Sequence, residues 1–135
     1  MQLIDDRLQY KKSWLGFFWV LIFGVFLTGL LPGNEFPAAP PIPHLDKIAH
    51  FLIYFLLAFV LEQIFVAKPK ALFIKAFAIG LVIETLQTQV PFRSFEAADL
   101  LANALGAFAG ILLSARVFPE SFLNFDRRLS GLKKT

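Results

Sequence analysis

An apolar run without a single charged residue extends from Trp14 to Leu31 and limits what this chain can fold into. An α-helix rises about 1.5 Å per residue, so roughly 17 to 20 apolar residues cross the hydrocarbon core of a bilayer. The sequence of 135 residues is 57% hydrophobic, contains 17 Phe and has a mean hydropathy of +0.65. A soluble domain of this size cannot bury so much apolar surface, so lipid is the expected solvent for the excess.

Three further apolar stretches follow, and prolines mark where they end. Proline has no amide hydrogen and interrupts helices, which places helix ends near Pro69, Pro91 and Pro119. The expected spans are residues 14–31, 47–66, 71–90 and 97–117. The predicted fold class is therefore all-α, a transmembrane four-helix bundle. An N-terminal segment, the bundle and a C-terminal tail would occupy residues 1–13, 14–117 and 118–135.

Three segments around the spans need their own interpretation. Lys11 and Lys12 before the first run would also suit a signal peptide, but the run is too long and lacks a clean small-residue cleavage site. The proline-rich stretch 31–43 has little helical character and is expected to lie extended on the surface. The tail is expected to form either a short interfacial helix or a loose end.

Lysine and arginine are unevenly distributed among the segments outside the spans. The N-terminal segment, the 67–70 loop and the tail hold most of them: Arg7, Lys11, Lys12, Lys68, Lys70, Arg127, Arg128, Lys133 and Lys134. The other two loops have only Lys47 and Arg93. The positive-inside rule therefore predicts that both termini and the 67–70 loop are cytoplasmic. Topology also explains the net charge of +3, so nucleic acid is not an expected partner.

Polar residues gather at the expected outer ends of spans two, three and four. They are Asp46, Lys47, His50, Tyr54, Glu84, Gln87, Arg93, Asp99 and Asn103. Asp46, His50 and Tyr54 follow one another at intervals of four residues and therefore share one helix face. An ionisable side chain inside a membrane costs about 2.5–3.5 kcal/mol on insertion scales, which makes Glu84 the most informative residue of the set. We expect these side chains to form one site beneath the outer surface.

Small residues are expected to bring the helices together next to this cluster. Gly80 extends the face of Glu84 and Gln87, four residues before Glu84. Gly106 and Gly110 form a G-x-x-x-G pattern in the fourth span, and two glycines at this spacing let another helix approach closely. The polar groups should therefore point into the bundle and away from lipid.

Each polar residue also has a structural interpretation when it is taken alone. Asp46 and Asp99 suit the N-terminal ends of helices, where a carboxylate caps the backbone. His50 alone suits a packed or interfacial histidine, and Arg93 alone suits a surface anchor. The convergence of these groups at one depth, from three separate spans, is what favours a shared cluster.

Two stretches, "DKIAHFLIYFLL" and "GLVIETLQTQVPFRSFEAADLLANALGAFAG", contain this set in a fixed order. The order is D-K-x-x-H-F, then E-x-x-Q, then Arg, then D-x-x-x-N-x-x-G-x-x-x-G, and it resembles the VanZ-like family of small bacterial membrane proteins. The resemblance covers about residues 46–110. It implies a multi-pass protein of the bacterial cytoplasmic (inner) membrane, part of the cell envelope. The family's namesake is linked to teicoplanin resistance, which the resemblance does not extend to this chain. The matching positions that would form a shared site are Asp46, Lys47, His50, Glu84, Gln87, Arg93, Asp99 and Asn103.

The first hypothesis for function is binding without catalysis. Lys47 and Arg93 would hold the phosphate of a lipid head group, or an envelope compound, at the outer leaflet. Membrane lipids are then the expected partners.

The alternatives are an intramembrane enzyme and a structural or proton-coupled component. In the enzyme, His50 would act as base or nucleophile, oriented by Asp46, while Glu84 and Asp99 would serve as acids or as ligands of Mg²⁺, Mn²⁺ or Zn²⁺. A proton path would need a homo-oligomer, because four spans leave little room for one within a monomer. The absence of cysteine excludes disulfides and thiolate sites. The sequence identifies no cofactor and assigns no metal ligand outright.

Overall fold

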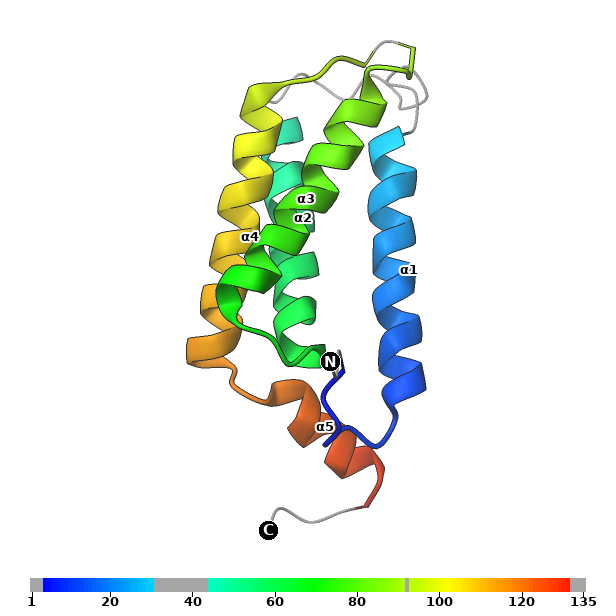
Figure 1. The fold of residues 1–135 in the computed structure, drawn as a ribbon, viewed down its shortest axis with the longest axis vertical. Helices are drawn as coiled ribbons and strands as arrows, with labels where there is room; N and C mark the ends of the chain where they lie inside the picture. The colour runs from blue at the N-terminus through cyan, green and yellow to red at the C-terminus, as the bar shows by residue number, and fades with distance from the viewer. Residues whose placement is uncertain (1–3, 31–43, 92, 132–135) are drawn as a thin grey trace.

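The described part of the chain is a bundle of five α-helices without strands (Figure 1). The computed structural model describes residues 4–30, 44–91 and 93–131. The helices are α1 (Lys11–Leu30), α2 (Leu45–Ile64), α3 (Pro69–Gln87), α4 (Ala97–Val117) and α5 (Ser121–Leu129). The first four run side by side along the long axis, and α5 lies across one end (Figure 1). The predicted all-helical bundle is confirmed, while the proline-rich stretch 31–43 lies outside the described residues.

The helix bounds differ from the expected spans by a few residues. α1 begins at Lys11, before the apolar run, and α2 begins at Leu45. α3 begins at Pro69 because proline is tolerated in the first helical turn, where its missing amide has no partner to lose. The same helix ends at Gln87, since the amides of Gln89 and Val90 bond to carbonyls only three residues back. α4 matches the expected range of 97–117.

Three helices, α1, α2 and α4, are long and apolar enough to cross a membrane. α3 has a similar length of 19 residues but contains three charged residues, Lys70, Lys75 and Glu84. It packs against α1, α2 and α4. The role of α3 as a fourth span therefore stays a prediction.

The two ends of the bundle hold different segments of the chain (Figure 1). One end, hereafter the site end, holds the last turn of α1, the first turn of α2, the last turn of α3 and the first turn of α4. The opposite end, hereafter the tail end, holds the N-terminal segment, the α2–α3 connection and α5. Most of the described basic residues lie at the tail end: Arg7, Lys11, Lys12, Lys68, Lys70, Arg127 and Arg128. That this end faces the cytoplasm stays a prediction.

Two glycines let α4 lie directly against the backbone of α2, and this pair is the most extensively packed in the bundle. A Cβ atom added at Gly106 would lie 2.2 Å from the carbonyl oxygen of Phe51, and one added at Gly110 would lie 2.2 Å from that of Phe55. Real side chains do not approach a carbonyl so closely, so neither position has room for one. This contact fixes the register of the two helices and hence which polar residues meet at the site end.

α1 is the peripheral helix of the bundle. Only Phe18 and Val25 are buried along it, while Trp19, Val20 and Phe23 are among its exposed apolar side chains. A helix that is apolar on all sides and exposed on most of them is suited to lipid contact. α1 therefore covers one side of the α2–α3–α4 core without becoming part of it.

Asp126 of α5 joins the tail to the N-terminal segment. Its side chain is buried and accepts hydrogen bonds from the backbone amides of Gln9 (2.6 Å) and Tyr10 (3.1 Å) and from the indole Nε1 of Trp14 (2.7 Å). Since these amides precede α1 directly, the carboxylate stabilises the start of that helix. Of the two expectations for the tail, the short helix is correct over Ser121–Leu129, and this helix is docked against the protein.

Gln63 forms a second polar joint at the tail end. Its amide nitrogen donates to Ser114 Oγ (2.6 Å) and to the Phe118 carbonyl (2.8 Å), and its oxygen accepts from the amide of Phe122 (3.0 Å). One buried side chain thus connects α2, the end of α4 and the start of α5. The Phe118 carbonyl, just past the end of α4, also accepts hydrogen bonds from the amide and the hydroxyl of Ser121 at the start of α5.

The N-terminal segment predicts an acid-dependent part of the stability. Asp5 accepts hydrogen bonds from Arg7 Nε (3.0 Å) and Nη2 (2.7 Å), and these hold the pKa of Asp5 below its usual value of 3.8. A carboxyl group with a lowered folded-state pKa stabilises the fold above its unfolded pKa, and the contribution is lost as the pH falls through the folded pKa. Wild-type protein should therefore lose stability below about pH 4, and we expect a smaller loss in Asp5→Asn. The measurement is the thermal unfolding midpoint in detergent as a function of pH. Asp6→Asn is the control, and an unchanged acid limb in Asp5→Asn would contradict the assignment.

Candidate functional site

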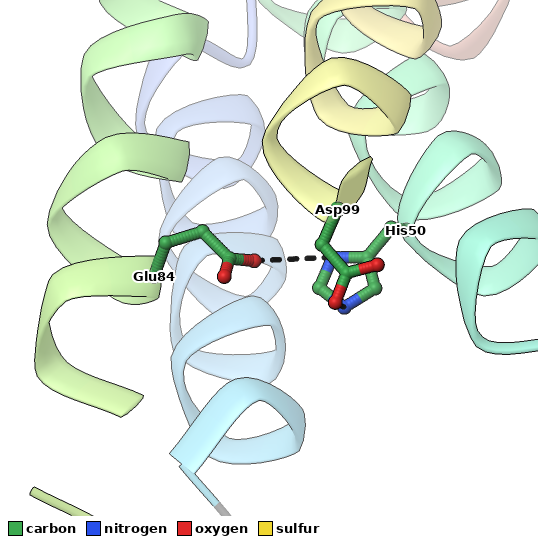
Figure 2. A group of neighbouring side chains, drawn as sticks. All are labelled: His50, Glu84 and Asp99. Carbon is green, nitrogen blue, oxygen red and sulfur yellow. Dashed lines mark ion pairs between the residues drawn. The ribbon is translucent and has the colours of Figure 1, made fainter. Parts of the chain in front are cut away.

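Three helices bring His50, Glu84 and Asp99 together at the site end. Figure 2 shows the Glu84 carboxylate directed from α3 towards the imidazole of His50 on α2, with Asp99 of α4 beside the ring. Nδ1 of His50 lies 3.7 Å from Glu84 Oε1, and Nε2 lies 3.7 Å from Asp99 Oδ2. The histidine ring therefore lies between two carboxylates from two other helices.

Asn103 holds the imidazole ring in place. Its Oδ1 lies 3.0 Å from His50 Nδ1, a hydrogen bond whose direction depends on the histidine tautomer. Asn103 is one turn before Gly106 on α4, so the glycine contact that fixes the register also sets this pair. The sequence predicts that Asp46 orients His50, but in the structure the partner of the ring is Asn103. Asp46 accepts a hydrogen bond from Lys47 instead.

Tyr54 and Gly80 complete the inner wall of the site. A Cβ atom at Gly80 would lie 3.2 Å from the Tyr54 ring and 3.3 Å from Asn103 Nδ2, so the glycine leaves room for both groups. Among the described residues, neither the Tyr54 hydroxyl nor Asn103 Nδ2 has a hydrogen-bond partner. Two buried polar groups are therefore available to a ligand at this depth.

Lys47 is surrounded by carboxylates. Its Nζ lies 2.7 Å from Asp46, 2.5 Å from Glu96 and 2.7 Å from Asp99. The contact with Asp99 Oδ1 is an ion pair. Lys47 is therefore largely neutralised by one acid of α2, one of α4 and Glu96 just before α4, which changes its expected role as a phosphate ligand.

Glu84 is the most deeply buried acid of the site. Its side chain has no exposed surface, and neither of its oxygens has a hydrogen-bond partner in the described part of the chain. Burying an ionised carboxylate without a partner is costly, so such groups pair, bind a cation or take up a proton. The distance of 3.7 Å to His50 is too long for a direct hydrogen bond.

A pocket of about 210 Å³ opens beside this cluster, between α1, α2 and α3. Its polar lining consists of Thr28, Asp46, His50, Tyr54, Gln87 and Arg93. Gln87 also donates to the Gly29 carbonyl (2.8 Å) in the last turn of α1, which ties the peripheral helix to α3. The structure thus brings Asp46, His50 and Arg93 to one pocket. Glu84, Asp99 and Asn103 do not line the pocket and reach it only through their contacts with the His50 ring.

Glu96 and the end of α1 were not among the site residues expected from the sequence. Glu96 precedes α4 and contacts Lys47, and its spacing of three residues from Asp99 was the signal that could have identified it. Thr28 and Gly29 line the pocket, and Thr28 is the only polar side chain in the second half of α1.

The chemistry available to the site is cation binding and proton exchange. His50, Glu84 and Asp99 each offer a ligand atom, and these atoms lie within 4.8 Å of one another. Asp46, Glu96 and Asp99 form a second group of three acids, and the ammonium of Lys47 contacts all of them. Together the two groups contain four acids, whereas the basic residues that form described ion pairs with them are Lys47 and His50.

Comparisons with known proteins place this arrangement in a family. The model of the VanZ/LLP1 family matches residues 5–118. An uncharacterised protein of Schizosaccharomyces pombe is 30% identical over an aligned stretch of 109 residues, and the alignment covers 77% of this chain and 64% of that relative. The chain therefore spans somewhat less than two thirds of the length of this curated relative. No solved structure matches the chain. Since the family model covers the helices that build the site, the chain belongs to the VanZ/LLP1 family.

Proposed function

We propose that this protein is a membrane protein that binds the head group of a phospholipid in the pocket beside His50. The head group would be zwitterionic, with one phosphate and one ammonium group. Arg93 would contact the phosphate and Asp46 the ammonium, because the pocket is lined by both. This proposal moves the phosphate contact from Lys47 to Arg93, since three carboxylates already surround Lys47.

The observation that carries the proposal is that the polar pocket adjoins an apolar groove. The α1–α2 groove has a volume of about 210 Å³ and is lined by Val20, Leu21, Gly24, Val25, Thr28, Ile53, Leu56 and Leu57. Val25, Thr28 and Ile53 line both the pocket and the groove. A polar pocket that continues into an apolar groove has the same order of surfaces as a lipid with its head group and acyl chain.

The location that we propose is the bacterial inner membrane, with the site end outside and both termini in the cytoplasm. The distribution of basic residues supports this orientation, because Lys47 and Arg93 are the described basic residues at the site end. At the outer leaflet, the pocket would lie at the depth of head groups, and the α1–α2 groove would extend into the acyl layer.

Filling the α1–α2 groove tests the proposal. A Cβ atom at Gly24 meets nothing within 4 Å, so Gly24→Leu should fold normally and place its side chain in the groove. We expect about tenfold less phospholipid to copurify with this variant, measured by mass spectrometry, which corresponds to about 1.4 kcal/mol of binding free energy. Gly16→Leu is the matched control, because Gly16 lies on the same helix, is equally open and is not among the groove residues.

The head-group class is tested with nanodiscs of defined composition. Wild-type protein should retain phosphatidylethanolamine in preference to phosphatidylglycerol, which lacks the amine, and Asp46→Asn should abolish the preference. Equal lipid retention by Gly24→Leu and Gly16→Leu would contradict binding in the groove. A preference that survives Asp46→Asn would contradict recognition of the ammonium group by this acid.

A further inference from the structure

The buried carboxylate of Glu84 points to a second ligand that differs in kind from a lipid. Both of its oxygens lack a partner among the described residues, and the side chain has no exposed surface. It is directed at His50 across a gap of 3.7 Å, and Asp99 lies at the same distance from the other ring nitrogen (Figure 2). The ion-pair partner of Glu84 among the described residues is His50, which is a cation only when it is protonated.

We infer that His50, Glu84 and Asp99 bind one divalent transition-metal ion between α2, α3 and α4. One imidazole nitrogen and two carboxylates match the ligand preferences of Zn²⁺ and Mn²⁺. Two ligands at about 2.1 Å from a common ion lie about 3.4 Å apart at the tetrahedral angle. The ligand atoms of these residues lie within 4.8 Å of one another, so side-chain adjustments on the order of 1 Å bring them to that spacing.

The hydrogen bond between His50 and Asn103 is the second contact that such a site uses. In metal-bound histidines, the N–H of the other ring nitrogen commonly donates a hydrogen bond to an oxygen, which fixes the tautomer. Nδ1 faces both Asn103 Oδ1 and Glu84 Oε1, and Nε2 faces Asp99. Binding through Nε2 would therefore keep the hydrogen bond to Asn103 and would require the Glu84 carboxylate to shift towards the Nε2 side of the ring. Asn103 would then be a positioning residue.

The neighbouring acids Asp46, Glu96 and Asp99 form a less suitable metal site. The ammonium of Lys47 contacts all three carboxylates at 2.5–2.7 Å and so provides their positive charge. Glu84 has no such contact with a lysine or arginine among the described ion pairs. Asp99 belongs to both groups, so the acid that distinguishes the His50 group is Glu84.

Metal binding is tested on the full-length chain, purified in detergent, stripped with a chelator and titrated with Mn²⁺ or Zn²⁺. The wild type should bind one ion per chain by elemental mass spectrometry, with bound Mn²⁺ changing its electron paramagnetic resonance spectrum. Glu84→Gln and Asp99→Asn should each weaken binding at least about tenfold. Glu96→Gln is the charge-matched control and should leave the affinity unchanged, because Glu96 contacts Lys47 and lies outside the His50 group.

Thermal unfolding provides a readout that does not depend on the metal count. Added metal should raise the midpoint of the wild type and of Glu96→Gln but not that of Glu84→Gln, since only a folded site gains stability from its ligand. Glu84→Gln without metal should be at least as stable as wild type, because the change removes a buried charge that has no hydrogen-bond partner among the described residues. Failure of the wild type to bind metal stoichiometrically, or equal metal binding by Glu84→Gln and wild type, would overturn the inference.

The metal site does not depend on the proposed lipid function. Glu84 lies outside the lining of the pocket and of the α1–α2 groove, and Gly24 lies outside the metal group. Glu84→Gln should therefore lose metal and keep lipid, while Gly24→Leu should lose lipid and keep metal. If one proposal fails, the result for the other can still be interpreted, because lipid binding and metal binding are measured on different variants.

Discussion

Replacing Gly106 with alanine is expected to destabilise the protein by about 3 kcal/mol, the upper end of the usual cost of overpacking. The new Cβ atom would lie 2.2 Å from the Phe51 carbonyl oxygen and 3.0 Å from its carbon. Because the clash is with main-chain atoms, no change of rotamer relieves it, and α2 and α4 must move apart. The separation would also pull Asn103 away from His50, so the site should be lost together with the packing.

The measurement is the free energy of unfolding in detergent or bicelles, followed by tryptophan fluorescence or circular dichroism. Gly16→Ala is the control within a helix, since a Cβ atom at Gly16 meets nothing within 4 Å. That change should be neutral or stabilise the helix by up to about 1 kcal/mol, owing to the better helix propensity of alanine. Similar effects of Gly106→Ala and Gly16→Ala would show that α2 and α4 are not in backbone contact.

Removing the carboxylate of Asp126 is expected to cost about 3 kcal/mol, because Asp126→Ala leaves three donors without their acceptor. The donors are the amides of Gln9 and Tyr10 and the indole of Trp14, and the carboxylate has no exposed surface. Loss of these bonds should release α5 and loosen the start of α1. Increased proteolysis of the tail and faster amide hydrogen exchange in α1 would report both effects.

Asp126→Asn should recover part of the lost stability, since the amide oxygen can still accept hydrogen bonds. Asp6→Ala is the control from the same region. Asp6 is an exposed acid paired with Lys11, and an exposed ion pair contributes little to stability. A tail that is as resistant to proteolysis in Asp126→Ala as in wild type would contradict a connecting role for Asp126.

The sequence was sufficient to predict the helices and the end of the bundle at which the polar residues meet. Helix periodicity places residues on faces, and the alternation of membrane spans places every second loop at one end, so both features depend only on local pattern. The glycine pattern of α4 likewise indicated a close helix contact, because the requirement for small side chains is visible in the sequence. His50, Glu84 and Asp99 lie together in the structure.

The pairing of individual side chains could not be predicted in the same way. By sequence, Lys47 and Arg93 are equivalent candidates for a phosphate ligand, yet Lys47 contacts three acids in the structure. Which of the two cations is neutralised depends on the acids that its side chain reaches on a neighbouring helix. The spacing of residues along one helix does not give this information. The docking of α5 also cannot be predicted from local pattern, because a single buried acid, Asp126, determines it through donors more than a hundred residues away.

The peripheral position of α1 has a consequence for how a ligand would reach the pocket. α1 buries few side chains and is joined to α3 at the site end by the hydrogen bond from Gln87 to Gly29, and to α5 at the other end through Asp126. A lipid bound between α1 and α2 could therefore exchange sideways with the surrounding leaflet. Its occupancy would then follow the mole fraction of that lipid in the bilayer and would be insensitive to the composition of the aqueous phase.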